Sequence, residues 1–335
     1  WWQHPLFGDI TGLPPPEIAE GLEELVRRRI MSAVGEGFGF THGRIRRVVY
    51  EELLEPRRRT LHAAVGEALE ALYADRPAEV YDRLAHHYVQ AGVPGKAVTY
   101  LTLMAETARV RYALDDALRA FDQARALVEG SPSPSREHRR LDVLLGKSLT
   151  LSVLGRFRDI LTLLLPEADR VAKLGEPALF AAYHFRVALT HAYLGDQPLA
   201  REAAARAVEA ASREGNEMVM GQGHYVLALS AYWSGAPDAG VRHARRAIEL
   251  LANIGRRDWL GLAHLALGAN LHLHGDLDGS LEAHSQVETL GRALADARLL
   301  SLAAFGRGIV HAERGEWEKA VEEGRCALEA SLDPY

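Results

Sequence analysis

From residue 155 onward, glycine recurs every 40 residues, and this regularity constrains the fold more than any other feature of the sequence. The first series comprises Gly155, Gly195, Gly235, Gly275 and Gly315. A second series lies half a period later and comprises Gly175, Gly215, Gly255 and Ala295. Such a repeat is typical of solenoids, in which one supersecondary unit stacks on its own copies. Because Gly commonly ends a helix in the left-handed conformation, two glycines per period predict two helices of about 17 residues in each repeat.

Small residues at constant distances from these glycines indicate that the paired helices approach closely. Seven residues before each glycine of the first series stand Ser148, Ala188, Ala228, Gly268 and Gly308. Five residues after it stand Ile160, Ala200, Gly240, Ser280 and Ala320. This pattern resembles the tetratricopeptide (TPR) signature in a lengthened form. We therefore predict an all-α fold, a right-handed TPR-like superhelix of antiparallel helix pairs. In the first copy, Pro166 should kink or end the second helix.

The residues before the array predict a small mixed segment. Pro14 to Pro16 precede an apolar stripe with helical spacing, which predicts a helix to about Arg29. Residues 30–34 and 38–41 flank Gly35-Glu36-Gly37, a pattern that indicates a β-hairpin. A helix, a hairpin and a further helix make up the second half of a winged helix.

We divide the chain into three parts on this basis. Residues 1–55 are a partial winged-helix segment, residues 56–135 are linking helices and irregular TPR-like units, and residues 136–335 are five regular 40-residue repeats. Gly92 and Gly155 are 63 residues apart, which is not a multiple of 40. The Ser- and Pro-rich loop at residues 130–135 is where we expect the change of phase.

The sequence from Phe40 to Leu54, with Arg57 to His62, resembles the segment that joins winged helix to TPR region in bacterial STAND-class signalling ATPases. That class includes LuxR-type large ATP-binding regulators and ATPases associated with nucleotide cyclases. The resemblance covers roughly residues 15–130. It implies that the chain is the C-terminal winged-helix end and TPR region of a larger cytoplasmic protein, and that ATP or ADP is bound outside this chain.

His42 is the residue to which the resemblance assigns a function. In that class a histidine just after the wing contacts the β-phosphate of bound ADP, and Thr41-His42-Gly43 occupies the same place, with Gly43 where Asp is usual. The alternative is that His42 caps the helix that begins near Gly43. Within the chain we expect no cofactor, because Gly146-Lys147-Ser148 has only the end of a P-loop and Leu141 stands where its leading Gly belongs.

Charge and composition argue against nucleic acid and membrane as partners. The net charge is −6, and the basic cluster at residues 44–59 is interleaved with Glu51, Glu52 and Glu55. Solvated helix faces with ion pairs explain this cluster better than phosphate contacts. The single cysteine, Cys326, and the lack of a 20-residue apolar span favour a reducing, cytoplasmic location.

Metal binding and catalysis are not indicated. His184, His224 and His264 recur at 40-residue spacing, but neighbouring helix axes are about 10 Å apart, too far for one ion. The His272 to Gly279 stretch spans a helix end and a turn, where Asp serves as a cap. No nucleophile or paired-carboxylate arrangement can be assembled, so we expect no enzyme activity and no metal site.

The first helix of each TPR pair lines the concave face, and its inward positions predict a groove. These positions hold Phe185, Tyr193, Gln222, Tyr225, Tyr232, Trp233, Leu265, His272 and Phe305, with Leu189, Leu262 and Ile309 beside them. Two interpretations stay open: a hydrophobic groove for a partner, or packing between repeats. Tyr232 and Trp233 together favour the groove, because adjacent bulky residues cannot both point into one core.

The sequence therefore predicts a non-catalytic interaction or sensor scaffold of a larger signalling ATPase or transcriptional regulator. Its partner would be a protein, a peptide, a small inducer or its own ATPase domain, and the ends of the array allow a homodimer. One alternative is a free-standing TPR adaptor. Another is the accessory region of a nucleotide cyclase, kinase or DNA-binding regulator whose active domain lies outside this chain.

Overall fold

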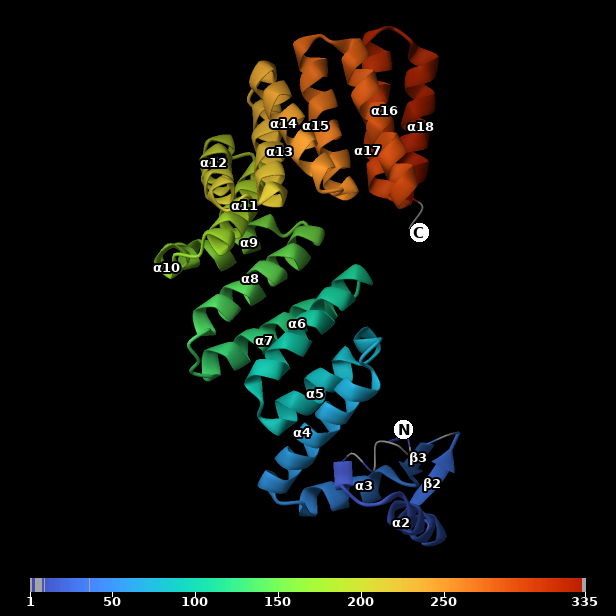
Figure 1. Cartoon of the computed structure of the whole chain (residues 1–335). Helices are drawn as coiled ribbons and strands as arrows, with labels where there is room; N and C mark the ends of the chain where they lie inside the picture. Colours follow the sequence, from blue (N-terminus) through green and yellow to red (C-terminus); the bar gives the residue numbers. More distant parts are fainter. Residues whose placement is uncertain (1, 4–7, 9, 36, 333–335) are drawn as a thin grey trace. The chain divides into compact units, whose positions relative to one another are not determined.

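The structure is a computed structural model that describes residues 2–3, 8, 10–35 and 37–332. It divides into two compact units, Trp1–Thr150 and Leu151–Tyr335. Helices dominate both units, and within the described residues the strands belong to a single sheet near the N-terminus (Figure 1). The predicted all-α fold of successive helix pairs is confirmed. The handedness of the superhelix remains a prediction.

The N-terminal segment contains α2 (Pro15–Arg27) and a sheet. Strands β2 (Met31–Val34) and β3 (Gly37–Phe40) form the expected antiparallel hairpin, with Ser32 opposite Gly39. A short strand β1 (Trp2–Gln3), which the sequence analysis did not predict, pairs with the other edge of β3. Ile18, Leu22 and Met31 form the small core beneath the hairpin.

The first unit continues as a series of helices. They are α3 (Gly43–Glu52), α4 (Glu55–Leu72), the 3-10 turn η1 (Pro77–Glu79), α5 (Tyr81–Ala91), α6 (Pro94–Val110) and α7 (Leu114–Gly130). Helices α4 to α7 pack one on the next, and Tyr88 and Phe121 are fully buried between them. The loop at residues 131–135 separates α7 from α8 (Arg136–Val153), where the change of phase was predicted.

The second unit begins with an interrupted helix. Helix α9 (Phe157–Leu164) ends before the 3-10 turn η2 (Leu165–Glu167), and α10 (Ala168–Leu174) follows. Pro166 lies in this turn, and it cannot donate the backbone hydrogen bond that a continuous helix needs. The predicted break is confirmed.

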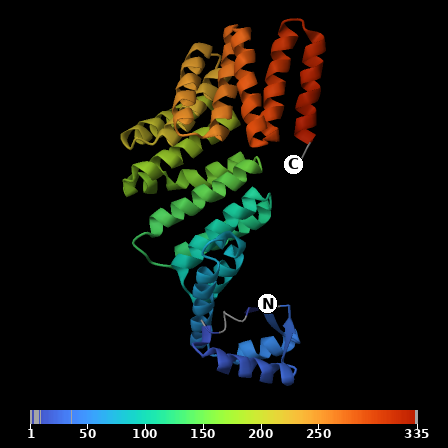
Figure 2. The same ribbon diagram turned by 45° about the vertical axis from the view of Figure 1, so that its right-hand side comes forward.

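Regular pairs of helices make up the rest of the second unit (Figures 1 and 2). The first helices of the pairs are α11 (Pro177–Leu194), α13 (Glu217–Trp233), α15 (Arg257–His274) and α17 (Ala297–Glu313). The second helices are α12 (Gln197–Arg213), α14 (Pro237–Asn253), α16 (Leu277–Leu294) and α18 (Trp317–Leu332). Their lengths of 16 to 18 residues agree with the predicted value.

The recurring glycines end these helices as predicted. Every glycine of both series has a positive φ, between 64° at Gly215 and 91° at Gly275. Ala295, which takes the place of glycine in the second series, adopts the same left-handed conformation with a φ of 50°. The 40-residue period therefore comes from backbone geometry that Gly adopts without steric cost.

Small residues allow the helices to approach closely, as the sequence predicted. A Cβ atom on Gly240 of α14 would lie 1.8 Å from Oδ1 of Asn270 on α15, so a larger residue cannot be placed there without displacement. The buried Asn270 amide donates to the carbonyl of Ala228 on α13 at 3.0 Å. The Ser280 hydroxyl donates to the carbonyl of Gly268 at 2.8 Å, which joins the two small positions of one repeat.

Candidate binding groove

The first helices of the pairs in the second unit form one continuous face. Helix α11 contacts α13, α13 contacts α15, and α15 contacts α17, while α12, α14 and α16 each pack between the first helices on either side. Because the first helices approach one another across the repeats, their face is the inner side of this stack. Side chains that project from this face are therefore the ones to consider for binding.

A cavity of about 340 Å³ lies on this inner face and is lined mainly by α13, α15 and α17. We call this cavity and its lining side chains the inner groove. Six of the nine groove residues named from the sequence line it, namely Tyr225, Tyr232, Trp233, Leu265, His272 and Phe305. The remaining lining residues are mostly Leu, Ile, Ala and Gly. The inner groove is therefore apolar and aromatic.

Exposure separates the surface of the groove from the core beneath it. Phe305 is 60% exposed and Trp233 is 44% exposed, so both present apolar rings to solvent. Tyr225 is only 3% exposed, although it occupies the same repeat position as Phe305. Phe305 and Trp233 can thus contact a partner directly, whereas Tyr225 supports the floor.

The other three of these nine residues do not line this cavity. Phe185 and Gln222 are 4% and 8% exposed and belong to the packing between helices. Tyr193 is 37% exposed and stacks on Phe157, with ring centroids 5.0 Å apart. Its ring also meets Trp233 of the next repeat edge to face at 6.3 Å, so Tyr193 extends the aromatic surface beyond the cavity.

Trp259 is an aromatic residue of this face that the sequence analysis did not identify. It lies at the start of α15, and its ring meets Phe185 at 5.5 Å and Tyr225 at 5.8 Å, both in T-shaped geometry. The equivalent positions in the other repeats hold Leu179, Val219 and Leu299. The sequence signal for this contact was a Trp at a position that carries a smaller, buried residue in the other repeats. Its ring must extend beyond the space that Leu fills.

Two histidines, His272 and His284, are among the polar residues of the inner groove. His272 Nε2 lies 3.0 Å from Oε1 of Glu313, which is about half exposed. His284, on α16, is 3% exposed, and its Nδ1 atom is buried without a hydrogen-bond partner among the described residues. Burial, followed by the charges of Arg307 and His272, lowers the pKa of His284 to about 4. His284 is therefore neutral near pH 7.

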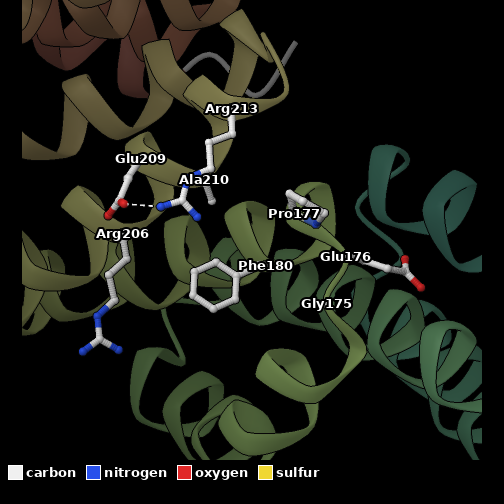
Figure 3. A pocket seen from close by; sticks show the side chains of 8 residues that line it. All are labelled: Gly175, Glu176, Pro177, Phe180, Arg206, Glu209, Ala210 and Arg213. Carbon is white, nitrogen blue, oxygen red and sulfur yellow. Dashed lines mark hydrogen bonds and ion pairs between the residues drawn. The ribbon is translucent and has the colours of Figure 1, made fainter.

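A second hollow lies elsewhere in the second unit, between the turn that precedes α11 and the end of α12 (Figure 3). Phe180 faces its centre, and the ring of Phe180 packs on His184 with centroids 4.2 Å apart. Its two arginines are each paired with a carboxylate, Arg213 with Glu209 and Arg206 with Glu202. Because each arginine is already paired, neither presents an unpaired charge to a ligand in this hollow. We therefore favour the inner groove as the binding site.

His42 lies outside the second unit, at the start of α3. Its side chain is exposed and makes no capping hydrogen bond, although the residue occupies the N-cap position. The neighbouring Thr41 hydroxyl donates to the carbonyl of Arg29 at 2.6 Å and fixes the end of the hairpin against the turn after α2. The structure thus holds the backbone around His42 in place and leaves its imidazole accessible.

Two other sequence motifs lie within packed helices. Lys147 of the P-loop-like triplet lies in α8 and pairs with Asp122 on α7, so this triplet is helix and not loop. His224 and His243 are in contact through their Nδ1 atoms at 3.0 Å, and burial lowers the pKa of each. Among the described residues, no group of three or more His, Cys, Asp or Glu side chains could hold a metal ion.

Comparisons with known proteins identify the fold. No family model and no curated protein matches the sequence. A Rap protein solved with competence and sporulation factor is 17% identical, with a TM-score of 0.55 over 86% of this chain and 79% of that chain. BtubC from P. vanneervenii is 18% identical, with a TM-score of 0.53 over 66% of this chain and 91% of that chain.

A third similar structure is a Signal Transduction ATPase with Numerous Domains (STAND) protein with a tetratricopeptide repeat sensor, from Pyrococcus horikoshii. It is 14% identical, with a TM-score of 0.53, and the match covers 98% of this chain and 60% of that chain. At these identities the likeness shows the fold alone, a TPR-like helical repeat. Within the described residues, none of the helices combines the length and the apolar character needed to cross a membrane.

Proposed function

We propose that this chain is a non-catalytic scaffold that binds a protein, a peptide or a small inducer in the inner groove. The observation that carries this proposal is the exposure of Trp233 and Phe305 around an apolar cavity of about 340 Å³. Contiguous patches of exposed apolar side chains often mark binding surfaces on soluble proteins. The cavity volume is at the lower end of the range of ligand sites, about 300 to 1,000 Å³.

The wider context of the proposal is a larger cytoplasmic signalling ATPase or transcriptional regulator, in which this chain is the sensor region. The resemblance of residues 40–62 to the winged-helix-to-TPR segment supports it, as does the fold likeness to a STAND protein along nearly the whole chain. In this context His42 senses a nucleotide held by an ATPase domain outside the chain. A free-standing adaptor, or the accessory region of a cyclase, kinase or DNA-binding regulator, would use the same groove.

Affinity purification tests the groove. The wild-type chain is compared with the double variant Tyr232→Ala/Trp233→Ala, and Trp317→Ala serves as the control, because Trp317 is 67% exposed on α18 and does not line the cavity. We expect the double variant to lose a partner that both wild type and Trp317→Ala retain. Equal recovery of every partner by all three proteins would contradict the proposal.

Nucleotide binding tests the context separately. We expect the isolated chain to show no measurable affinity for ATP or ADP in calorimetric titration, because the proposal places the nucleotide on a different domain. Tight ATP binding by this chain alone would contradict that assignment. It would leave the groove experiment unaffected.

A further inference from the structure

His284 differs from the other side chains that line the inner groove because it comes from a second helix, α16. Its ring lies between Gly268 of α15 and Gly306 of α17. A Cβ atom on Gly268 would lie 2.7 Å from His284 Nε2, and one on Gly306 would lie 2.3 Å from Cε1. Both first helices therefore carry glycine where the imidazole needs the space.

The packing of His284 leaves one of its two ring nitrogens without a hydrogen-bond partner among the described residues. Its Nδ1 has no hydrogen-bond partner among the described residues, although the side chain is 97% buried (3% exposed). A buried polar atom without a partner destabilises the folded state, and an apolar residue of similar size would avoid that cost. A histidine in this position therefore needs a reason other than stability.

The protonation state of His284 defines what it can bind. Its pKa is lowered to about 4, so near pH 7 the ring is neutral and offers one acceptor and one donor. Arg307, whose charge contributes to this effect, is itself held by Glu288 and Glu323. Among the described residues that line the cavity, none is Lys, Arg, Asp or Glu. The site therefore suits an uncharged ligand group.

We propose that the inner groove is an anchor pocket for one bulky apolar side chain of a peptide, and that an uncharged N–H next to that side chain donates to His284. This inference rests on the proposed function and specifies its ligand. The aromatic and aliphatic lining packs around the ligand's side chain, and His284 accepts a hydrogen bond from the amide N–H beside it. A peptide that presents a carboxylate at this point binds weakly, because none of the described residues that line the cavity is Lys or Arg, and Glu313 lies beside His272.

The probe for this inference is N-acetyl-phenylalaninamide, a neutral aromatic amide, whose binding to the full chain is followed by saturation-transfer NMR. We expect His284→Leu to weaken binding about fivefold or more, as loss of one hydrogen bond predicts. His264→Leu is the matched control. His264 also has a buried, unpartnered Nδ1, but it does not line the cavity, so this variant should bind as wild type does. N-acetyl-phenylalanine, which carries a carboxylate, should bind more weakly than the amide.

A stability measurement distinguishes binding from structure. Because Nδ1 is unpartnered, His284→Leu should leave the thermal midpoint unchanged or raise it while binding falls. His284→Gln keeps a neutral hydrogen-bonding group and should recover part of the affinity. A lowered midpoint in the Leu variant with no recovery of binding by Gln would overturn the inference.

Phe305→Ala separates the two claims. Phe305 is largely exposed, so its removal should weaken the probe without unfolding the chain. If Phe305→Ala weakens binding and His284→Leu does not, the groove binds the ring and the inference about His284 is wrong. If the probe binds wild type and Phe305→Ala equally, or binds neither, both the inference and the proposed groove are wrong.

Discussion

Replacement of Ala295 by glycine should stabilise the chain, although it removes a side-chain carbon. Ala295 follows the last residue of α16 with φ 50° and ψ 40°, in the left-handed region. The turn is closed by Asp296, whose N–H donates to the Gly291 carbonyl at 2.9 Å. Ala295 is exposed, so its methyl group adds little packing. The eight other residues of the two series are all glycine, and all have a positive φ.

The expected magnitude comes from two opposing effects. An L-residue pays about 1–2 kcal/mol to adopt the left-handed conformation. Relief of this strain by glycine is offset by about 0.4–1 kcal/mol, because glycine has more conformational freedom in the unfolded chain. Ala295→Gly should therefore raise the free energy of unfolding by about 0.5–1 kcal/mol. The thermal midpoint should rise by about 2–4 °C per kcal/mol for a unit of this size.

Urea denaturation followed by circular dichroism measures this change, and two variants serve as controls. Gly255→Ala introduces the same strain at the equivalent turn, where an added Cβ meets nothing within 4 Å, and should destabilise by a similar amount. Ala252→Gly changes an exposed position in the last turn of α14 and should destabilise by up to about 1 kcal/mol, the cost of glycine within a helix. If Ala295→Gly destabilised as Ala252→Gly does, the account of the helix ends would be refuted.

Three further predictions concern packing and protonation. Gly240→Ala should destabilise by about 1–3 kcal/mol in urea denaturation, because its Cβ would overlap the Asn270 amide; an unchanged midpoint would mean that the helices do not pack this closely. Phe185→Ala should cost about 3–5 kcal/mol, as for a buried ring, whereas Trp233→Ala should cost much less because Trp233 is largely exposed; similar losses would contradict the division into core and groove. The third prediction is a loss of stability in acid, from four histidines whose pKa is lowered to about 4: His87, His184, His224 and His284. In the unfolded chain these rings take up a proton below about pH 6.5, whereas in the folded chain they do so only near pH 4. The free energy of unfolding should thus be highest above about pH 6.5 and should fall toward pH 4. The loss due to His284 alone should be up to about 3 kcal/mol. Thermal midpoints between pH 4 and 8 measure this, and a flat profile would contradict it.

The helices of the second unit could be predicted because their ends depend on a single local property. Left-handed backbone at each end is nearly restricted to glycine, so the spacing of Gly195, Gly235 and the others is visible in the sequence. The interruption at Pro166 was predictable for the same reason, since proline acts on its own backbone. Strand β1 was missed because two residues carry no periodic pattern, and their pairing with β3 depends on the hairpin.

The composition of the inner groove was only partly accessible from the sequence. Repeat position places Tyr225 and Phe305 at equivalent points, but Trp259 packs over Tyr225, and Phe305 is left 60% exposed. Burial at one repeat position thus depends on a neighbour that the period does not fix. His284 was not predicted at all, because its access to the cavity depends on Gly268 and Gly306 on two different helices.

Site-specific photo-crosslinking from within the inner groove tests the central claim most directly. A photoreactive p-benzoylphenylalanine in place of Trp233 in the full-length protein would report what contacts this face in cells, and the same residue in place of Trp317 is the control. The account predicts an adduct with a defined protein or peptide at position 233 that is absent at position 317 and is lost when Phe305 is changed to Ala. Adducts that form equally at both positions, or that are unaffected by Phe305→Ala, would contradict it.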